Sequence, residues 1–173
     1  KLVHKKLAND AYAWMFGKND MFNGFENICR VLDIDPERVR VRAMAMSKDD
    51  VAKIDISIPP DGKGLPAGSG SVAQGAAIFQ QKCEVCHGAA GAGTPSGDRL
   101  VGGIGSLNTA NPVKTVNSYW PYATTVFDYI RRAMPNPNPK SLQNDEVYAL
   151  VAYILSIDNV VPKDAVLDAT SLP

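Results

Sequence analysis

The stretch Cys83-Glu84-Val85-Cys86-His87 decides how the rest of this chain is interpreted. It has the Cys-x-x-Cys-His spacing that is typical of c-type haem attachment. Two thiols three positions apart can both bond to the vinyl edge of one porphyrin, and the imidazole that follows then faces the iron. The motif therefore predicts one covalently attached haem c, with Cys83 and Cys86 as its thioether links and His87 as its proximal ligand.

Two other uses of paired cysteines fit the sequence less well. A structural zinc site needs four ligands, and only Cys29 and His4 are left to complete one. A thioredoxin-like pair belongs beside a strand in a βαβ unit, and the chain shows no such alternation. Cys29 lies on an apolar helix face and is expected to be a buried free thiol, whereas His4 is expected to be exposed.

The haem iron of an electron carrier commonly takes Met as its sixth ligand. Five methionines are available: Met15, Met21, Met44, Met46 and Met134. Met134 follows a helix-like stretch and precedes Pro135-Asn136-Pro137-Asn138-Pro139, and proline stops a helix and fixes φ. We therefore predict that Met134 is held on a stiff extended loop as the distal ligand. The alternatives are Met44, Met46, His4 or an open site.

A helix is predicted just before the haem motif. Ser71 can cap its N-terminus, and Phe79 and Gly75 lie one and two turns before Cys83 on the same face. A glycine at that place lets a second backbone approach closely. We expect the partner to be the helix near the C-terminus.

That second helix has apolar residues at intervals of three and four, at Val147, Leu150, Val151 and Ile154. Asn144 or Ser141 is its expected N-cap, and Leu150 or Tyr153 can fill the space beside Phe79. Residues 88–118 are rich in Gly, Ser, Asn and Thr and are predicted to be a loop. A third helix is predicted over 124–133, leading into Met134.

The positions Gly75, Phe79, Cys83, Cys86, His87, Met134, Leu150 and Tyr153 together resemble the pattern of class I cytochromes c. This resemblance implies an all-α fold in which the terminal helices cross over a haem. It also implies that His87 and Met134 are the axial ligands of the iron and that Cys83 and Cys86 hold the haem.

A closer resemblance rests on four strings: Ile56–Pro66, Gly68-Ser69-Gly70, Tyr119–Thr124 and Phe127–Pro135. They are similar to the cytochrome c subunit of bacterial sulfite and sulfane dehydrogenases of the Sox sulfur-oxidation system. The similar stretch runs from about residue 47 to residue 161, roughly two thirds of the chain. The Trp-Pro-Tyr and Tyr-Ile-Arg-Arg-Ala-Met-Pro sequences make it more specific than a likeness to cytochromes c in general.

The closer resemblance implies a periplasmic electron-transfer subunit rather than a catalyst by itself. Family members take electrons from a molybdopterin-containing subunit that oxidises a sulfur compound, and pass them to another cytochrome c. The chain would relay one electron at a time. Two alternatives are a free soluble electron shuttle and a haem enzyme that acts on thiosulfate or peroxide.

Several polar and aromatic residues are candidates for contacts to the haem. Arg131 and Arg132 can pair with a haem propionate or a partner carboxylate, or they can be solvated charges at a helix C-terminus. Trp120 and Tyr122 can pack on the porphyrin, in the core or at an interface. Arg99 is a weaker candidate for a propionate.

Composition excludes other classes of function. The 173 residues carry 18 basic and 18 acidic side chains, so no long-range field is available to hold a nucleic acid. The longest apolar run, Val147–Leu155, has nine residues, whereas a membrane-spanning helix needs about 20. We expect neither a nucleic-acid partner nor a membrane span.

The chain is predicted to have four parts. Residues 1–46 form a helical N-terminal segment that docks on the haem domain or on a partner, with Asp35-Pro36 starting one of its helices. Residues 47–70 form a short helix, opened by the capping box Ser47–Asp50, and an extended arm. Residues 71–161 form the class I cytochrome c domain, and residues 162–173 form a C-terminal tail.

Overall fold

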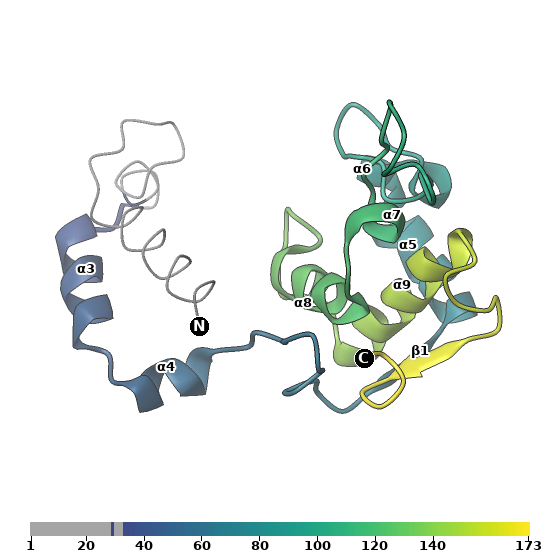
Figure 1. The fold of residues 1–173 in the computed structure, drawn as a ribbon. Helices are drawn as coiled ribbons and strands as arrows, with labels where there is room; N and C mark the ends of the chain where they lie inside the picture. Colours follow the sequence, from purple (N-terminus) through teal and green to yellow (C-terminus); the bar gives the residue numbers. More distant parts are fainter. Residues whose placement is uncertain (1–28, 30–32) are drawn as a thin grey trace. The chain divides into compact units, whose positions relative to one another are not determined.

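The computed structural model describes residue 29 and residues 33–173. The chain divides into two units, Lys1–Asp55 and Ile56–Pro173, each of which is described by itself (Figure 1). Cys29 is a buried free thiol, as predicted, and the other predictions for residues before 33 lie outside the described part. Among the described residues, none of the helices combines the length and apolar character that crossing a bilayer requires.

Two capped helices form the described part of the N-terminal unit. Helix α3, Pro36–Ala45, begins where the Asp35 carboxylate accepts a hydrogen bond from Glu37 N at 2.9 Å. Helix α4, Lys48–Ile54, begins at the predicted capping box, in which Ser47 Oγ accepts from Asp50 N at 3.1 Å. Both starts agree with the prediction, because Pro at the first position and a side-chain acceptor at the cap satisfy free backbone donors.

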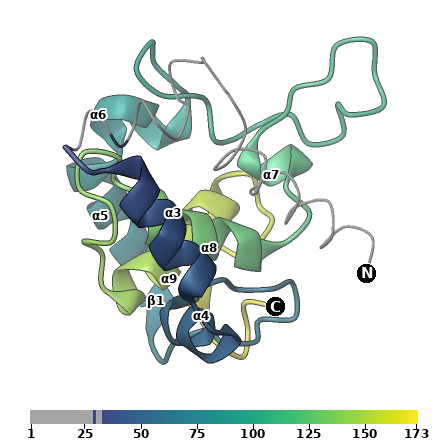
Figure 2. The same cartoon turned by 90° about the vertical axis from the view of Figure 1, so that its left-hand side faces the viewer.

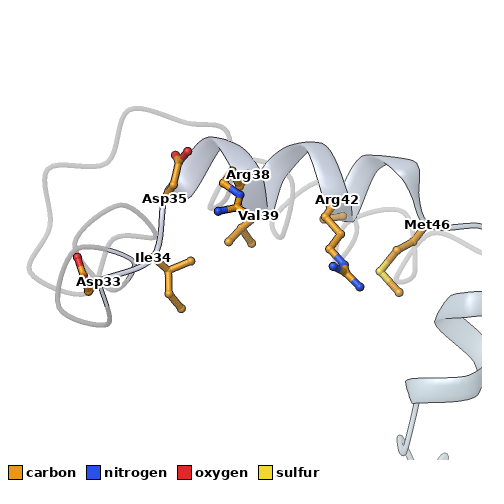
Figure 3. A pocket seen from close by; sticks show the side chains of 8 residues that line it. Asp33, Ile34, Asp35, Arg38, Val39, Arg42 and Met46 are labelled. Atoms are coloured by element: carbon orange, nitrogen blue, oxygen red, sulfur yellow. The ribbon is translucent and has the colours of Figure 1, made fainter.

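No residue of α3 is buried. A hollow of about 560 Å³ runs along one side of this helix. Figure 3 shows Ile34, Val39, Arg42 and Met46 pointing toward that side, so that a basic side chain lies among apolar ones along it.

The C-terminal unit contains helices and one small sheet. Its elements in chain order are β1 (Ser69–Ser71), α5 (Val72–Lys82), α6 (Glu84–His87), the 3₁₀ turn η1 (Ala89–Gly91), α7 (Val116–Tyr119), α8 (Ala123–Ala133), α9 (Asn144–Ile157) and β2 (Val166–Asp168). The predicted helical fold is confirmed. The short antiparallel pair β1–β2 was not predicted, because three-residue strands leave too little periodicity to detect.

Helices α5 and α9 pack against each other at Gly75. A Cβ added to Gly75 would overlap the carbonyl group of Ala149, so only glycine lets the two backbones approach this closely. One turn further, the rings of Phe79 and Tyr153 lie 5.3 Å apart between their centroids. Ser71 caps α5, accepting from Gln74 N at 3.2 Å, as predicted.

The predicted start of α9 is wrong. The N-cap is Gln143, whose backbone N donates to the Glu146 carboxylate at 2.8 Å. Asn144 is already inside the helix, and its Nδ2 donates to Ala67 O at 3.2 Å. The capping side chain expected from local sequence is therefore used to hold a distant segment instead.

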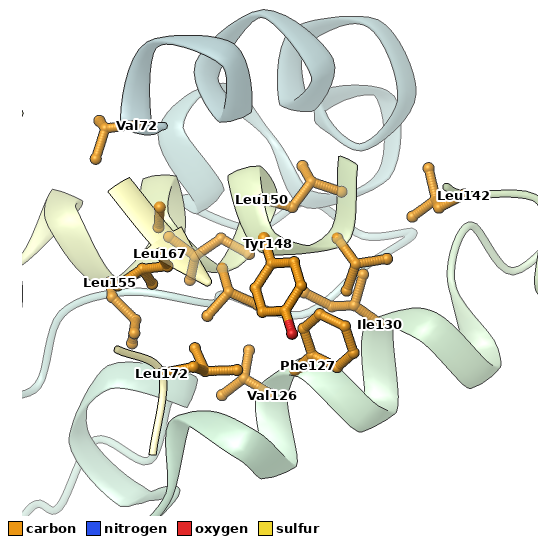
Figure 4. Close-up of a cluster of buried hydrophobic side chains, with 14 of the residues drawn as sticks. Val72, Val126, Phe127, Ile130, Leu142, Tyr148, Leu150, Leu155, Leu167 and Leu172 are labelled. Atoms are coloured by element: carbon orange, nitrogen blue, oxygen red, sulfur yellow. The ribbon is translucent and has the colours of Figure 1, made fainter. Parts of the chain in front are cut away.

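The core lies between α8 and α9 (Figure 4). Phe127 and Tyr148 are fully buried, and their ring centroids are 4.5 Å apart. The segment before β1 packs on the same core: Ile58 is buried, and Tyr148 Oη donates to Pro66 O at 2.8 Å. Helix α9 thus anchors the segment that precedes the predicted haem domain.

The C-terminal residues also belong to this packed unit. β2 pairs with β1 in an antiparallel register, with Leu167 opposite Gly70, and Leu167 and Leu172 are buried in the core. The predicted boundaries at 70/71 and 161/162 therefore fall inside the packed unit, because apolar side chains on both flanking segments complete its core.

Candidate functional site

One cavity of about 600 Å³ in the C-terminal unit brings together the four residues that are predicted to hold the haem. Cys83, Cys86, His87 and Met134 all line it. Cavities that hold cofactors commonly have volumes of about 300–1,000 Å³. Residues more than 45 positions apart in the sequence are therefore brought to one site of suitable size.

The end of α5 places the cysteines and the histidine. Cys83 closes α5, its N donating to Phe79 O at 2.9 Å. The single turn α6 follows, in which Cys86 N and His87 N both donate to Cys83 O, at 3.1 and 2.9 Å. The helix break at Cys83 thus presents three reactive side chains from one short turn.

The His87 ring is held by backbone from a later loop. Its Nδ1 lies 2.8 Å from Asp98 O. A carbonyl oxygen only accepts, so Nδ1 carries the proton, and Nε2 keeps a free lone pair for a metal. A second partner of this kind orients a metal-binding histidine and raises its basicity.

The loop that supplies Asp98 packs tightly against the cysteine turn. Thr94 Oγ1 donates to Cys86 O, and Gly93 N donates to His87 O at 2.6 Å. A Cβ added to Gly97 would lie only 2.7 Å from Cys86 O. Glycine at position 97 is therefore required for this close approach.

Burial raises the pKa of the Cys83 thiol to about 11, although the neighbouring Lys82 charge acts in the opposite direction. Reactive catalytic cysteines have a lowered pKa and an electropositive surrounding. Cys83 is therefore a protonated thiol in an apolar wall at neutral pH. That environment suits a thioether link and does not suit a redox-active thiolate.

Met134 lies directly after α8. Its N donates to Ile130 O at 3.1 Å, and its backbone is extended, with φ −116° and ψ 148°. Pro135 and Pro137 line the same cavity. Met134 itself thus has the predicted extended backbone directly after α8, whereas the proline run that follows forms turns, with Asn138 N donating to Pro135 O at 2.8 Å.

The remaining walls fit a flat apolar macrocycle. The deep part is formed by buried side chains of three helices, α5, α8 and α9, including Phe79, Val126, Ile130 and Leu150. Val85, between the two cysteines, lines the cavity and is 81% exposed, so the cavity opens to solvent beside the attachment motif. An imidazole nitrogen and a thioether sulfur form the ligand pair that holds haem iron in electron carriers. The residues therefore fit haem c.

Comparisons with known proteins agree with this geometry. The family model described as cytochrome c oxidase, cbb3-type, subunit III matches residues 70–154. The crystal structure of the sulfane dehydrogenase SoxCD from Paracoccus pantotrophus contains a chain that is 41% identical, with a TM-score of 0.67. The chain carries a class I cytochrome c domain. Such a domain binds haem c and transfers electrons.

The match to SoxCD covers 73% of this cytochrome chain and 63% of the SoxCD chain. It therefore extends beyond the 85 residues of the family match, 70 to 154 inclusive. A comparison with curated proteins gives no match.

The cytochrome domain places the other candidate contacts differently. Trp120 lines the cavity, where its ring meets Tyr129 edge to face at 5.5 Å. Tyr122 does not line the cavity and is half exposed. Of these two predicted aromatic contacts, the structure brings only Trp120 to the site.

The two arginines before Met134 do not line the cavity. Arg132 Nη2 donates to both carboxylate oxygens of Asp128, at 2.8 and 3.1 Å, and to Ser57 Oγ at 3.3 Å. Arg131 is partly exposed on the same helix end. Arg132 lies one turn after its partner Asp128 on α8. Its hydrogen bond to Ser57 connects α8 to the segment before β1.

Sequence reasoning missed three residues at the site. The Asp98 carbonyl is a backbone group, so no side-chain pattern could reveal it. Tyr129 and Lys114 line the cavity, and Lys114 Nζ lies 5.0 Å from the centre of the Tyr119 ring. Lys114 could have been noticed in the sequence, because Arg99 and Lys114 are the only charged residues between Asp98 and Asp128.

Proposed function

We propose that this chain is a periplasmic monohaem c-type cytochrome subunit that carries single electrons from a molybdopterin-containing sulfite or sulfane dehydrogenase subunit to a downstream cytochrome c. The observation that carries the proposal is the gathering of Cys83, Cys86, His87 and Met134 around one cavity. The 41% identity to a SoxCD chain supports the sulfur-oxidation context.

Each of the four residues would have one role. Cys83 and Cys86 would hold the haem by thioether bonds, and His87 and Met134 would bind its iron. The haem, when bound, supplies reversible one-electron chemistry at iron. Ligation of the iron by the Met134 sulfur would raise the reduction potential. The apolar walls of the cavity would exclude water from the porphyrin.

The chain would transfer electrons without oxidising the sulfur compound itself. An iron with two side-chain ligands has no open position for a substrate, so the oxidation belongs to the molybdopterin subunit. Electrons would enter or leave near Val85, because this side chain is 81% exposed and lines the cavity. A haem edge close to solvent permits short electron transfer to a docked partner.

The test is to purify the protein gently from its native cells and to measure molybdenum and haem iron in the same fraction. Molybdenum that co-elutes with haem iron in a fixed ratio supports the dehydrogenase subunit. Haem iron without molybdenum would contradict it and leave the free shuttle or the haem enzyme.

Carbon monoxide binding to the reduced protein separates those two alternatives. A six-coordinate carrier binds it slowly, whereas a haem enzyme with an open iron binds it rapidly. Met134→Ala provides the matched control, because loss of the thioether opens the iron and should make binding rapid in the same protein.

A further inference from the structure

We infer that Arg99 and Lys114 form the binding site for the haem propionate carboxylates and so determine how the porphyrin is oriented in the cavity. This inference rests on the proposed haem c. Thioether bonds at Cys83 and Cys86 occupy the vinyl edge of the porphyrin, and the two propionates leave from the opposite edge. Two carboxylates must therefore meet another part of the cavity wall.

The apolar floor of the cavity is unsuitable for these carboxylates. A carboxylate that leaves water without a cation or hydrogen-bond donors is strongly destabilised. Phe79, Val126, Leu150 and Ile154, which line the deep part, offer neither. The propionates must therefore lie where the wall carries positive charge.

Four charged side chains line the cavity: Lys82, Asp98, Arg99 and Lys114. Lys82 already has a partner, since its Nζ lies 2.6 Å from a Glu146 carboxylate oxygen. Neither Arg99 nor Lys114 forms an ion pair with a described residue. The wall thus holds two cations that are available for anions, against the one carboxylate of Asp98.

The backbone keeps these two cations on neighbouring segments. Val116 N donates to Leu100 O at 3.1 Å, and Thr115 Oγ1 donates to Gly102 O at 2.7 Å. Residues 99–102 and 113–116 are thereby joined side by side. Arg99 and Lys114 stand one and two residues from the Leu100–Val116 bond, and both line the cavity.

Each of the two cations is suited to a carboxylate at a partly exposed site. The Arg99 guanidinium can bind a carboxylate through two parallel hydrogen bonds, and the Lys114 ammonium acts as a point charge. Lys114 Nζ also lies over the Tyr119 ring, at 5.0 Å from its centre. This contact limits the positions that the ammonium group can take. Arg131 and Arg132, the earlier candidates, do not line the cavity.

The test compares Arg99→Gln, Lys114→Gln and the control Lys63→Gln in the haem-loaded protein. Lys63→Gln removes the same charge from an exposed position that does not line the cavity. The readout is the propionate bending band in the resonance Raman spectrum, which responds to hydrogen bonds on the carboxylates. We expect this band to shift in Arg99→Gln and Lys114→Gln and to stay unchanged in Lys63→Gln.

The reduction potential provides a second readout. Loss of a cation beside a propionate favours ferric haem, so both cavity variants should have a lower potential than Lys63→Gln, and the difference should shrink at high salt. Arg99→Lys and Lys114→Arg should keep the potential of the unaltered protein. If the glutamine variants do not incorporate haem, these two variants keep the positive charge and still allow each position to be tested.

A propionate band that shifts in neither cavity variant, or in only one of them, overturns the two-residue site. Haem c content, measured first on the unaltered protein, separates failure of the propionate site from failure of the proposed function. Absence of covalent haem would overturn both the proposed function and the site, whereas haem c with an unchanged band would overturn the site alone.

Discussion

The Nδ1 atom of His87 lies 2.8 Å from the backbone carbonyl oxygen of Asp98. This contact joins the cysteine turn to the glycine-rich loop that follows it. The loop runs on from there to α7 (Figure 2). Because the acceptor is a carbonyl, the imidazole has one defined tautomer, and the lone pair of its Nε2 is left free for a metal.

Gly97→Ala should disturb this contact between the glycine-rich loop and the cysteine turn. The added Cβ would lie 2.7 Å from Cys86 O, so the loop must move away from the cysteine turn and loosen the Asp98 contact to His87. We expect a lower haem c content per polypeptide and a loss of stability of about 1–3 kcal/mol, the usual cost of overpacking. Haem content and thermal unfolding measure the two effects. Ser96→Ala is the control, and equal behaviour of the two variants would contradict the prediction.

Met134→Ala should lower the reduction potential by on the order of 0.1 V, a fraction of the roughly 0.8 V that axial ligands span in haem proteins. The reason is that a thioether stabilises ferrous iron. A redox titration measures the change. Met44→Ala, at a 65% exposed position in the N-terminal unit, is the control. An unchanged potential in Met134→Ala would remove this residue as the distal ligand.

Gly75→Val should destabilise the cytochrome domain by about 3 kcal/mol or more, since overpacking against a backbone carbonyl cannot relax by a change of rotamer. The clash is with Ala149 of α9. Ala77→Val, at an exposed position of the same helix, should cost only about 0.5 kcal/mol of helix propensity. Chemical denaturation of both variants tests the prediction, and similar midpoints would refute it.

Leu172→Ala should destabilise the domain by about 2–4 kcal/mol, as truncations of buried leucine do. Leu172 is only 4% exposed, although it is the second residue from the C-terminal end. Val166→Ala, at a 58% exposed position on β2, serves as the control. If Leu172→Ala unfolds at the same denaturant concentration as the control, the C-terminal residues do not contribute to the core.

The Lys82–Glu146 pair should make stability depend on acid pH. The hydrogen bond from Lys82 lowers the pKa of Glu146 below its ordinary value of 4.5. The resulting stabilisation is fully present above that value and is lost as the pH falls through the lower pKa of the folded protein. Because the pair is partly exposed, it contributes less than about 1 kcal/mol.

Glu146→Gln should therefore flatten the decline of stability below about pH 4.5, the ordinary pKa of this residue. Denaturation between pH 3 and 7, as a range of measurement, tests this. Lys82→Gln, which removes the partner and leaves the carboxylate, should weaken the same dependence. A decline that is equally steep in all three proteins would exclude Glu146 as its source.

Local sequence was sufficient for the features that depend on neighbouring residues. The Cys83–His87 motif, the caps at Ser47 and Ser71 and the extended backbone at Met134 all follow from the chemistry of a few adjacent positions. The contact of Gly75 with a second helix was also predictable, because a glycine on an apolar helix face has few other uses.

Tertiary structure decided the features in which distant segments meet. Asn144 was expected to cap α9, but it bonds to Ala67 O because the segment before β1 packs on that helix. Arg132 was a candidate for the haem, but it is paired with Asp128 and Ser57.

The sequence by itself was enough to predict haem attachment at Cys83 and Cys86 and to single out Met134, since these predictions depend on the spacing of a few residues and on proline. Only the tertiary structure decided which groups complete the site. The Asp98 carbonyl and Lys114 reach the cavity through hydrogen bonds between loops. Such contacts depend on the path of the chain in space, and no local pattern of residues encodes that path.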